Sequence, residues 1–142
     1  MASTTLLIEL LGGERIVGRK AESKWVELVR AGLPYPALES VMTNLGLTRE
    51  EVSDLLWVPL RTLARRKREH KLHAQESDRL FRLAKIGAHA VDVLGSRQNA
   101  ASWLRQPIRA LDGVAPIALL DTEAGAQQVE EVLGRIEYGL YS

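Results

Sequence analysis

Residues 47–70, "LTREEVSDLLWVPLRTLARRKREH", have the pattern of two short helices joined by a tight turn. Thr48 is a natural N-cap for the first helix, and Glu51 three residues later completes a capping box. Pro59 blocks extension of the first helix and suits the opening turn of a second. A short capped helix followed at once by a basic helix is typical of a helix-turn-helix module.

The second of these helices is strongly basic. Residues 59–71 contain six Arg and Lys side chains against the single carboxylate of Glu69, a net charge of +5. A solvated helix surface, which is the alternative interpretation, usually interleaves both signs of charge. The excess therefore favours contact with DNA. Leu63 is expected to face the core, and the residues expected to contact DNA are Arg61, Thr62, Arg65, Arg66 and Arg68. The first four of these are expected to point outward, while Arg68 suits a backbone phosphate.

The turn between the two helices departs from the usual pattern. Trp57 occupies the position that commonly holds glycine. A positive φ angle is uncommon for any other residue. Two arrangements would accommodate Trp57: a wider turn, or burial of the indole ring against the first helix.

The remainder of the chain also has helical periodicity. Helices are expected within residues 21–34, 35–46, 77–95, 96–111 (with a break at Pro107) and 121–139. Residues 1–20 mix a short apolar run with glycines and predict no definite element. Because no alternating run of strand length occurs, the expected fold class is all-α.

Composition limits the function without assigning it. The chain has 142 residues, enough for one compact domain or two small helical modules, and it contains no Cys. No apolar run approaches the length of a membrane span, which favours a cytoplasmic protein. The net charge is only +1, but residues 121–142 carry five carboxylates and one Arg, a net charge of −4. A basic middle and an acidic end indicate two different partners.

No constellation of residues suggests catalysis. His70 and His73 could share a helix surface, but no carboxylate pattern or Cys accompanies them, so a metal site is a weak interpretation. The chain has no nucleophile motif and no phosphate-binding glycine loop. We therefore expect no enzymatic activity, no cofactor and no metal.

The last eight residues, "RIEYGLYS" (135–142), are unusually aromatic for a chain end. Tyrosine buries a large amphipathic area at low entropy cost, so it is a common anchor at protein interfaces. The alternative is that Tyr138 and Tyr141 fold back onto Trp103 and close the core of their own domain.

Two blocks of the sequence resemble one known family. They are "LGLTREEVSDLLWVPLRTLARRK" (45–67) and the more distinctive "APIALLDTEAGAQQVEEVLGRIEYGLYS" (115–142). The second contains the family's Leu-Leu-Asp-Thr, glycine and Arg-Ile-Glu-Tyr-Gly, although only Gly113 remains of a frequent Gly-Gly turn. The chain resembles the Xre-type antitoxins (the MbcA/ParS/Xre group), which are partners of RES-domain toxins, over about residues 40–142.

The resemblance implies a bacterial antitoxin that covers the active-site cleft of an NAD-degrading RES-domain toxin. It also implies self-association, with a homodimer expected, and repression of its own operon through operator DNA. Toxin contact is then expected through Arg135, Glu137, Tyr138, Leu140, Tyr141 and Ser142, with the carboxylate of Ser142 suited to a cation that normally holds phosphate. The alternative is a stand-alone transcriptional regulator whose C-terminal domain only dimerises.

The expected organisation has three parts. An N-terminal segment with one helix spans residues 1–33, a helix-turn-helix DNA-binding module spans 34–74, and a small helical toxin-binding domain spans 75–142.

Overall fold

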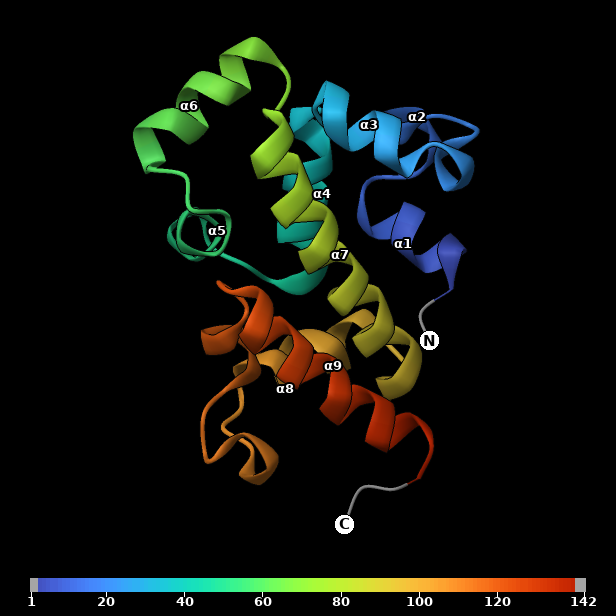
Figure 1. The fold of residues 1–142 in the computed structure, drawn as a ribbon, viewed down its shortest axis with the longest axis vertical. Helices are drawn as coiled ribbons and strands as arrows, with labels where there is room; N and C mark the ends of the chain where they lie inside the picture. Colours follow the sequence, from blue (N-terminus) through green and yellow to red (C-terminus); the bar gives the residue numbers. More distant parts are fainter. Residues whose placement is uncertain (1–2, 140–142) are drawn as a thin grey trace.

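The computed structural model describes residues 3–139, and helices are their only extended regular elements (Figure 1). The all-α fold class is therefore confirmed. No helix of the described part is long and apolar enough to cross a membrane. The α-helices are α1 (Thr4–Leu10), α2 (Glu14–Val17), α3 (Trp25–Ala31), α4 (Tyr35–Leu45), α5 (Arg49–Leu56), α6 (Leu60–Glu69), α7 (Ala74–Leu94), α8 (Arg97–Arg105) and α9 (Glu123–Glu137). Short 3-10 helices are η1 (Ala21–Ser23), η2 (Arg109–Leu111) and η3 (Pro116–Leu119).

Helix α7 runs through the middle of the molecule, and the other helices are arranged around it (Figure 1). It packs against α1 and α3 on one side and against α8 and α9 on the other. All six residues from Ile86 to Val91 are buried, so almost the whole circumference of this part of the helix is covered. A helix segment that is buried all round lies in the core, and this part of α7 does so.

The expectation of one helix in the N-terminal segment is wrong, because residues 3–33 contain α1 and α2 as well as the expected α3. Ser3 caps α1 by accepting a hydrogen bond from the backbone N–H of Leu6. Leu7, Leu10 and Leu11 are buried, and α1 packs against α7 and α4. This short apolar run is a helix because α7 offers it an apolar surface, since an isolated helix of this length is marginal in water.

The helix-turn-helix geometry is confirmed in its local details. Helix α4 ends at Gly46, which has a φ angle of 66°. The capping box at the start of α5 is present, because Thr48 and Glu51 exchange hydrogen bonds between side chain and backbone. Pro59 then precedes α6, and Leu63 is buried.

Both arrangements considered for Trp57 are wrong. Its φ and ψ angles are 58° and 41°, so it adopts the left-handed conformation that glycine usually supplies at a tight turn. The side chain is also 61% exposed rather than buried against α5. The turn therefore remains tight and carries an indole ring on the surface.

An ion pair joins α8 to the start of α5. Both nitrogens at the end of the Arg105 side chain donate to the two carboxylate oxygens of Glu51, at 2.7 and 2.6 Å, and one of them also donates to the carbonyl of Gly46. These hydrogen bonds from Arg105 lower the pKa of the Glu51 carboxyl to about 2. Arg105 thus attaches the helix-turn-helix to the C-terminal helices.

Replacing Glu51 with Gln should remove this ion pair while keeping an oxygen that can serve the capping box. A carboxyl with a folded-state pKa below its unfolded value of 4.5 stabilises the fold above about pH 4.5, and this contribution is lost as the pH falls towards 2. Because the pair is partly exposed, we expect E51Q to cost about 1 kcal/mol near neutral pH and nothing at the acid limit. Urea unfolding across this pH range measures the difference.

The matched control is E50Q, because Glu50 lies exposed in the first turn of the same helix. The unfolding free energy of E50Q should change with pH in the same way as that of the wild type over that range. An E51Q curve that is also parallel to the wild type would show that the ion pair contributes no pH-dependent stability.

Candidate functional site

The outer surface of α6 presents three of the predicted DNA-binding residues to solvent. Arg61, Arg65 and Arg68 are exposed, and Thr62 is half-buried near the start of the helix. Lys67 lies 3.6 Å from the carboxylate of Glu39 and is less available than the three arginines. The exposed guanidinium groups are suited both to guanine edges and to phosphates.

Arg66 does not point outward, so that expectation is wrong. The residue is 6% exposed, and its Nε and Nη2 atoms each donate to a carboxylate oxygen of Glu76 at 2.8 Å. A third hydrogen bond, of 3.3 Å, reaches Glu69. Burial raises the pKa of the Glu76 carboxyl, but the hydrogen bonds from Arg66 and from the backbone of His73, together with the charge of Arg66, outweigh burial, and the pKa lies below its usual value.

The signal for the inward direction of Arg66 was present in the sequence. Arg66 follows Leu63 by three residues, and residues three apart lie on the same side of a helix. The net positive charge of the helix led instead to the expectation that Arg66 contacts DNA. Arg66 therefore joins α6 to the start of α7 rather than meeting a ligand.

We expect Arg66→Ala to cost about 3 kcal/mol or more of unfolding free energy, because it leaves the Glu76 carboxylate buried without its cation. The double variant R66M/E76Q should recover most of that loss. Met fills a similar volume, and Gln keeps an oxygen for the backbone N–H of His73, which Glu76 accepts at 2.8 Å. Urea unfolding of both variants measures the recovery, and equal losses in the two would contradict a role of the unpaired charge.

Two of the histidines lie at the ends of helices. His70 ends α6 in the left-handed conformation, and His73 begins α7 within a capping box that includes Glu76. No group of three His, Asp or Glu side chains within residues 3–139 is arranged to hold a metal ion.

The third histidine holds the C-terminal helix in place, which the sequence analysis missed. His89 is 5% exposed on α7, and its ring lies between two carboxylates of α9. Nδ1 is 3.1 Å from Glu130 and Nε2 is 3.0 Å from Glu137. A doubly protonated ring would donate to both carboxylates, whereas a neutral ring would donate to one only. Glu130 and Glu137 are seven residues apart, a spacing that places both on one side of a helix.

The predicted toxin-binding residues therefore take different positions. Arg135 is exposed, but Glu137 turns back towards His89. Tyr138 is 73% exposed, so the alternative in which it packs inward is wrong. The predictions for Leu140, Tyr141 and Ser142 lie outside the described residues, as does the prediction that Tyr141 packs on Trp103.

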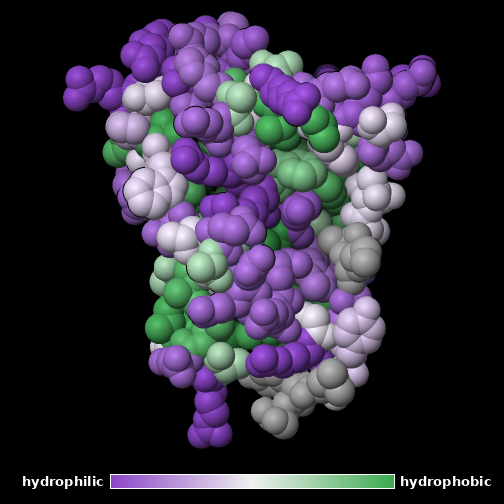
Figure 2. All heavy atoms as spheres, viewed as in Figure 1, coloured by the Kyte–Doolittle hydropathy of each residue, from purple (hydrophilic) through white to green (hydrophobic). Residues whose placement is uncertain are grey.

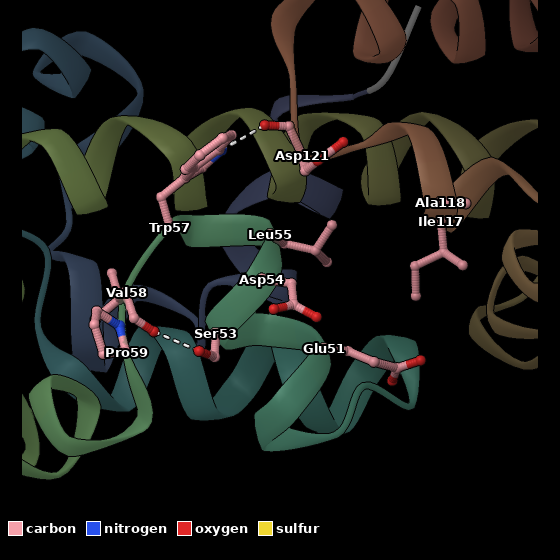
Figure 3. Close-up of a pocket in the computed structure, with 10 residues that line it drawn as sticks. All are labelled: Glu51, Ser53, Asp54, Leu55, Trp57, Val58, Pro59, Ile117, Ala118 and Asp121. Carbon is pink, nitrogen blue, oxygen red and sulfur yellow. Dashed lines mark hydrogen bonds between the residues drawn. The ribbon is translucent and has the colours of Figure 1, made fainter.

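The opposite end of α9 meets the helix-turn-helix. The indole Nε1 of Trp57 donates a 2.6 Å hydrogen bond to the backbone carbonyl of Asp121, directly before the N-cap Thr122 (Figure 3). Helix α9 begins so close to η3 that a Cβ atom at Gly125 would collide with the carbonyl of Leu119. This close approach explains why glycine stands in the first turn of α9.

The fold and its two surfaces define a helix-turn-helix protein with a helical C-terminal part that presents an aromatic residue. Comparisons with known proteins agree. Residues 24–85 match the model of the antitoxin Xre-like helix-turn-helix domain, and residues 89–139 match the antitoxin Xre/MbcA/ParS C-terminal toxin-binding domain. The chain belongs to the Xre antitoxin family.

Individual relatives support this assignment. The chain is 33% identical to "Antitoxin Xre" of Photorhabdus laumondii over 81% of its own length and 79% of the relative. It is 27% identical to the "Prs ADP-ribosylating antitoxin" of Sphingobium sp., over 82% and 80% of the two chains. A chain of the M. tuberculosis MbcT-MbcA toxin-antitoxin complex superposes with a TM-score of 0.55 and 28% identity, over 71% of this chain and 90% of that one.

Proposed function

We propose that this antitoxin inhibits a RES-domain, NAD-degrading toxin by placing the segment that follows α9 in the active-site cleft of the toxin. The observation that carries the proposal is Tyr138, which is 73% exposed directly after Glu137, a residue that His89 holds. A fixed helix end that presents a solvated aromatic ring is organised for binding before the partner arrives.

The position of α9 supports this role. Val129, Val132 and Leu133 are buried, and they pack the helix onto the core of the protein. Its direction is therefore set by the rest of the fold, and little ordering of the helix is required on binding. The name of the Sphingobium relative links an antitoxin with ADP-ribosylation, a reaction that consumes NAD.

The same chain is proposed to bind operator DNA and repress its own operon through α6. Arg61, Arg65 and Arg68 would then contact the major groove and the phosphates, with Thr62 at the start of the helix. Arg66 is not part of this set, because its guanidinium is held by Glu76. A homodimer would present two copies of α6 to two half-sites.

The inhibitory segment is tested by a chain that ends at residue 138 and carries Tyr138→Ala. We expect its apparent affinity for the toxin to fall at least about 30-fold, which is the loss of one aromatic hot spot of about 2 kcal/mol. The measurement is NAD consumption by the protein encoded beside this gene, titrated with each antitoxin chain. This truncation keeps Glu137 and its contact with His89, so the fold should be retained.

Val26→Ala is the matched control, because Val26 is a 62% exposed apolar residue far along the chain, on α3. It should inhibit as well as the wild type. If the truncated chain inhibits as well as the wild type, and circular dichroism shows both chains folded, the inhibitory contact lies on another surface of the protein. If the neighbouring protein consumes no NAD, the stand-alone regulator becomes the better assignment.

DNA binding is tested with Arg61→Ala and Arg65→Ala on the DNA upstream of the gene. Each substitution should weaken binding, and each lost phosphate contact should reduce the slope of log affinity against log salt by about one. Arg19→Ala removes the same charge from an exposed position near the N-terminus and should leave the slope unchanged. Unchanged affinity in both α6 variants would exclude this surface of α6 as the DNA-reading surface.

A further inference from the structure

A groove separates the helix-turn-helix from the segment that leads into α9. It has a volume of about 640 Å³, and it is lined by α5, the turn after α5, η3 and Asp121, which lies directly before the N-cap of α9 (Figure 3). Leu55, Val58 and Ile117 supply apolar surface, while the exposed ring of Trp57 stands at the edge. In Figure 2 the hydrophobic colour gathers at the lower left of the molecule, the region that the segment leading into α9 occupies in Figure 1.

The polar groups of the groove are acidic. Asp54, Asp121 and Glu51 line it, and no Arg or Lys within residues 3–139 does. Glu51 is committed to Arg105, but neither the Asp54 nor the Asp121 carboxylate has an ion-pair or hydrogen-bond partner among residues 3–139. An apolar floor with two unpartnered carboxylates and an indole ring matches a cationic side chain that arrives with apolar neighbours.

Two residues of the groove lower the stability of the local structure, one through its charge and the other through its backbone conformation. Asp54 lies in the last turn of α5, where the negative end of the helix dipole opposes another anion. Trp57 holds a left-handed conformation that glycine would adopt without strain. Residues that break local rules and face the same groove indicate selection for something other than stability.

We propose that this groove is a second docking site for the toxin, and that it receives an Arg- or Lys-bearing segment of that protein. This inference rests on the proposed function. The groove adjoins the start of α9 and Tyr138 follows its end, so the 15 residues of the helix separate the two sites by about 22 Å. A single protein interface of ordinary size spans such a distance. DNA does not fit, because the carboxylates repel phosphate.

The two unfavourable residues make a test that separates binding from stability. D54N removes an anion from a helix end, so it should unfold at the same or a higher temperature than the wild type. W57G relieves the left-handed turn but also removes the hydrogen bond from Trp57 to the carbonyl of Asp121, so its unfolding temperature should change little. Each should nevertheless bind the protein encoded beside this gene about tenfold more weakly. Isothermal titration calorimetry on full-length chains measures the affinity, and the difference for D54N should shrink at high salt.

Asp92→Asn is the matched control, because Asp92 is also an exposed carboxylate in the last turn of a helix, α7, and does not line the groove. It should keep the affinity within about twofold of the wild type. If the wild-type chain binds its neighbour but D54N and W57G bind equally well, the groove proposal is overturned while the proposed function stands. If the wild-type chain does not bind at all, both fail. A change in self-association alone would make a second copy the occupant and would also overturn the proposal.

Discussion

The burial of α7 is the constraint on which the rest of the structure depends. The six consecutive buried residues from Ile86 to Val91 require cover on every side, and no single neighbour can supply it. Helices α1 and α3 cover one side, and α8 and α9 cover the other. Helices α5 and α9 also pack on α7, and α5 packs on α6, so the basic helix α6 and the aromatic end of α9 are held in a defined relation.

Buried and partly buried ion pairs then set the directions of the functional helices. Arg66 on α6 reaches Glu76 at the start of α7, and Arg105 on α8 reaches Glu51 at the start of α5. Each pair also involves a carboxylate that completes a capping box. The same carboxylate therefore fixes the start of its own helix and the contact of that start with another helix. A carboxylate is costly to bury, and this double role is a specific use of it.

Helix α9 connects the two surfaces that are proposed to bind DNA and the toxin. Its beginning is joined to the helix-turn-helix by the hydrogen bond from Trp57, and its end is held by His89 just before Tyr138. The groove lined by Trp57 and Asp54 lies at the first of these junctions. A toxin that contacts both ends of α9 would therefore touch the turn at Trp57 that leads into α6. Binding of the toxin would then affect the surface of α6 that is proposed to bind DNA.

Local chemistry in the sequence determined the helical class, the capping box at Thr48, the stop at Gly46 and the inward position of Leu63, because each depends on residues a few positions apart. The aromatic end of the chain was also visible, and Tyr138 is exposed. Only the tertiary structure decided that Arg66 pairs with Glu76, that Glu137 pairs with His89 and that residues 4–10 form a helix. Those outcomes depend on partners 10 to 48 residues away or on an apolar surface made by another helix. Separations of that kind leave no periodic mark in the sequence.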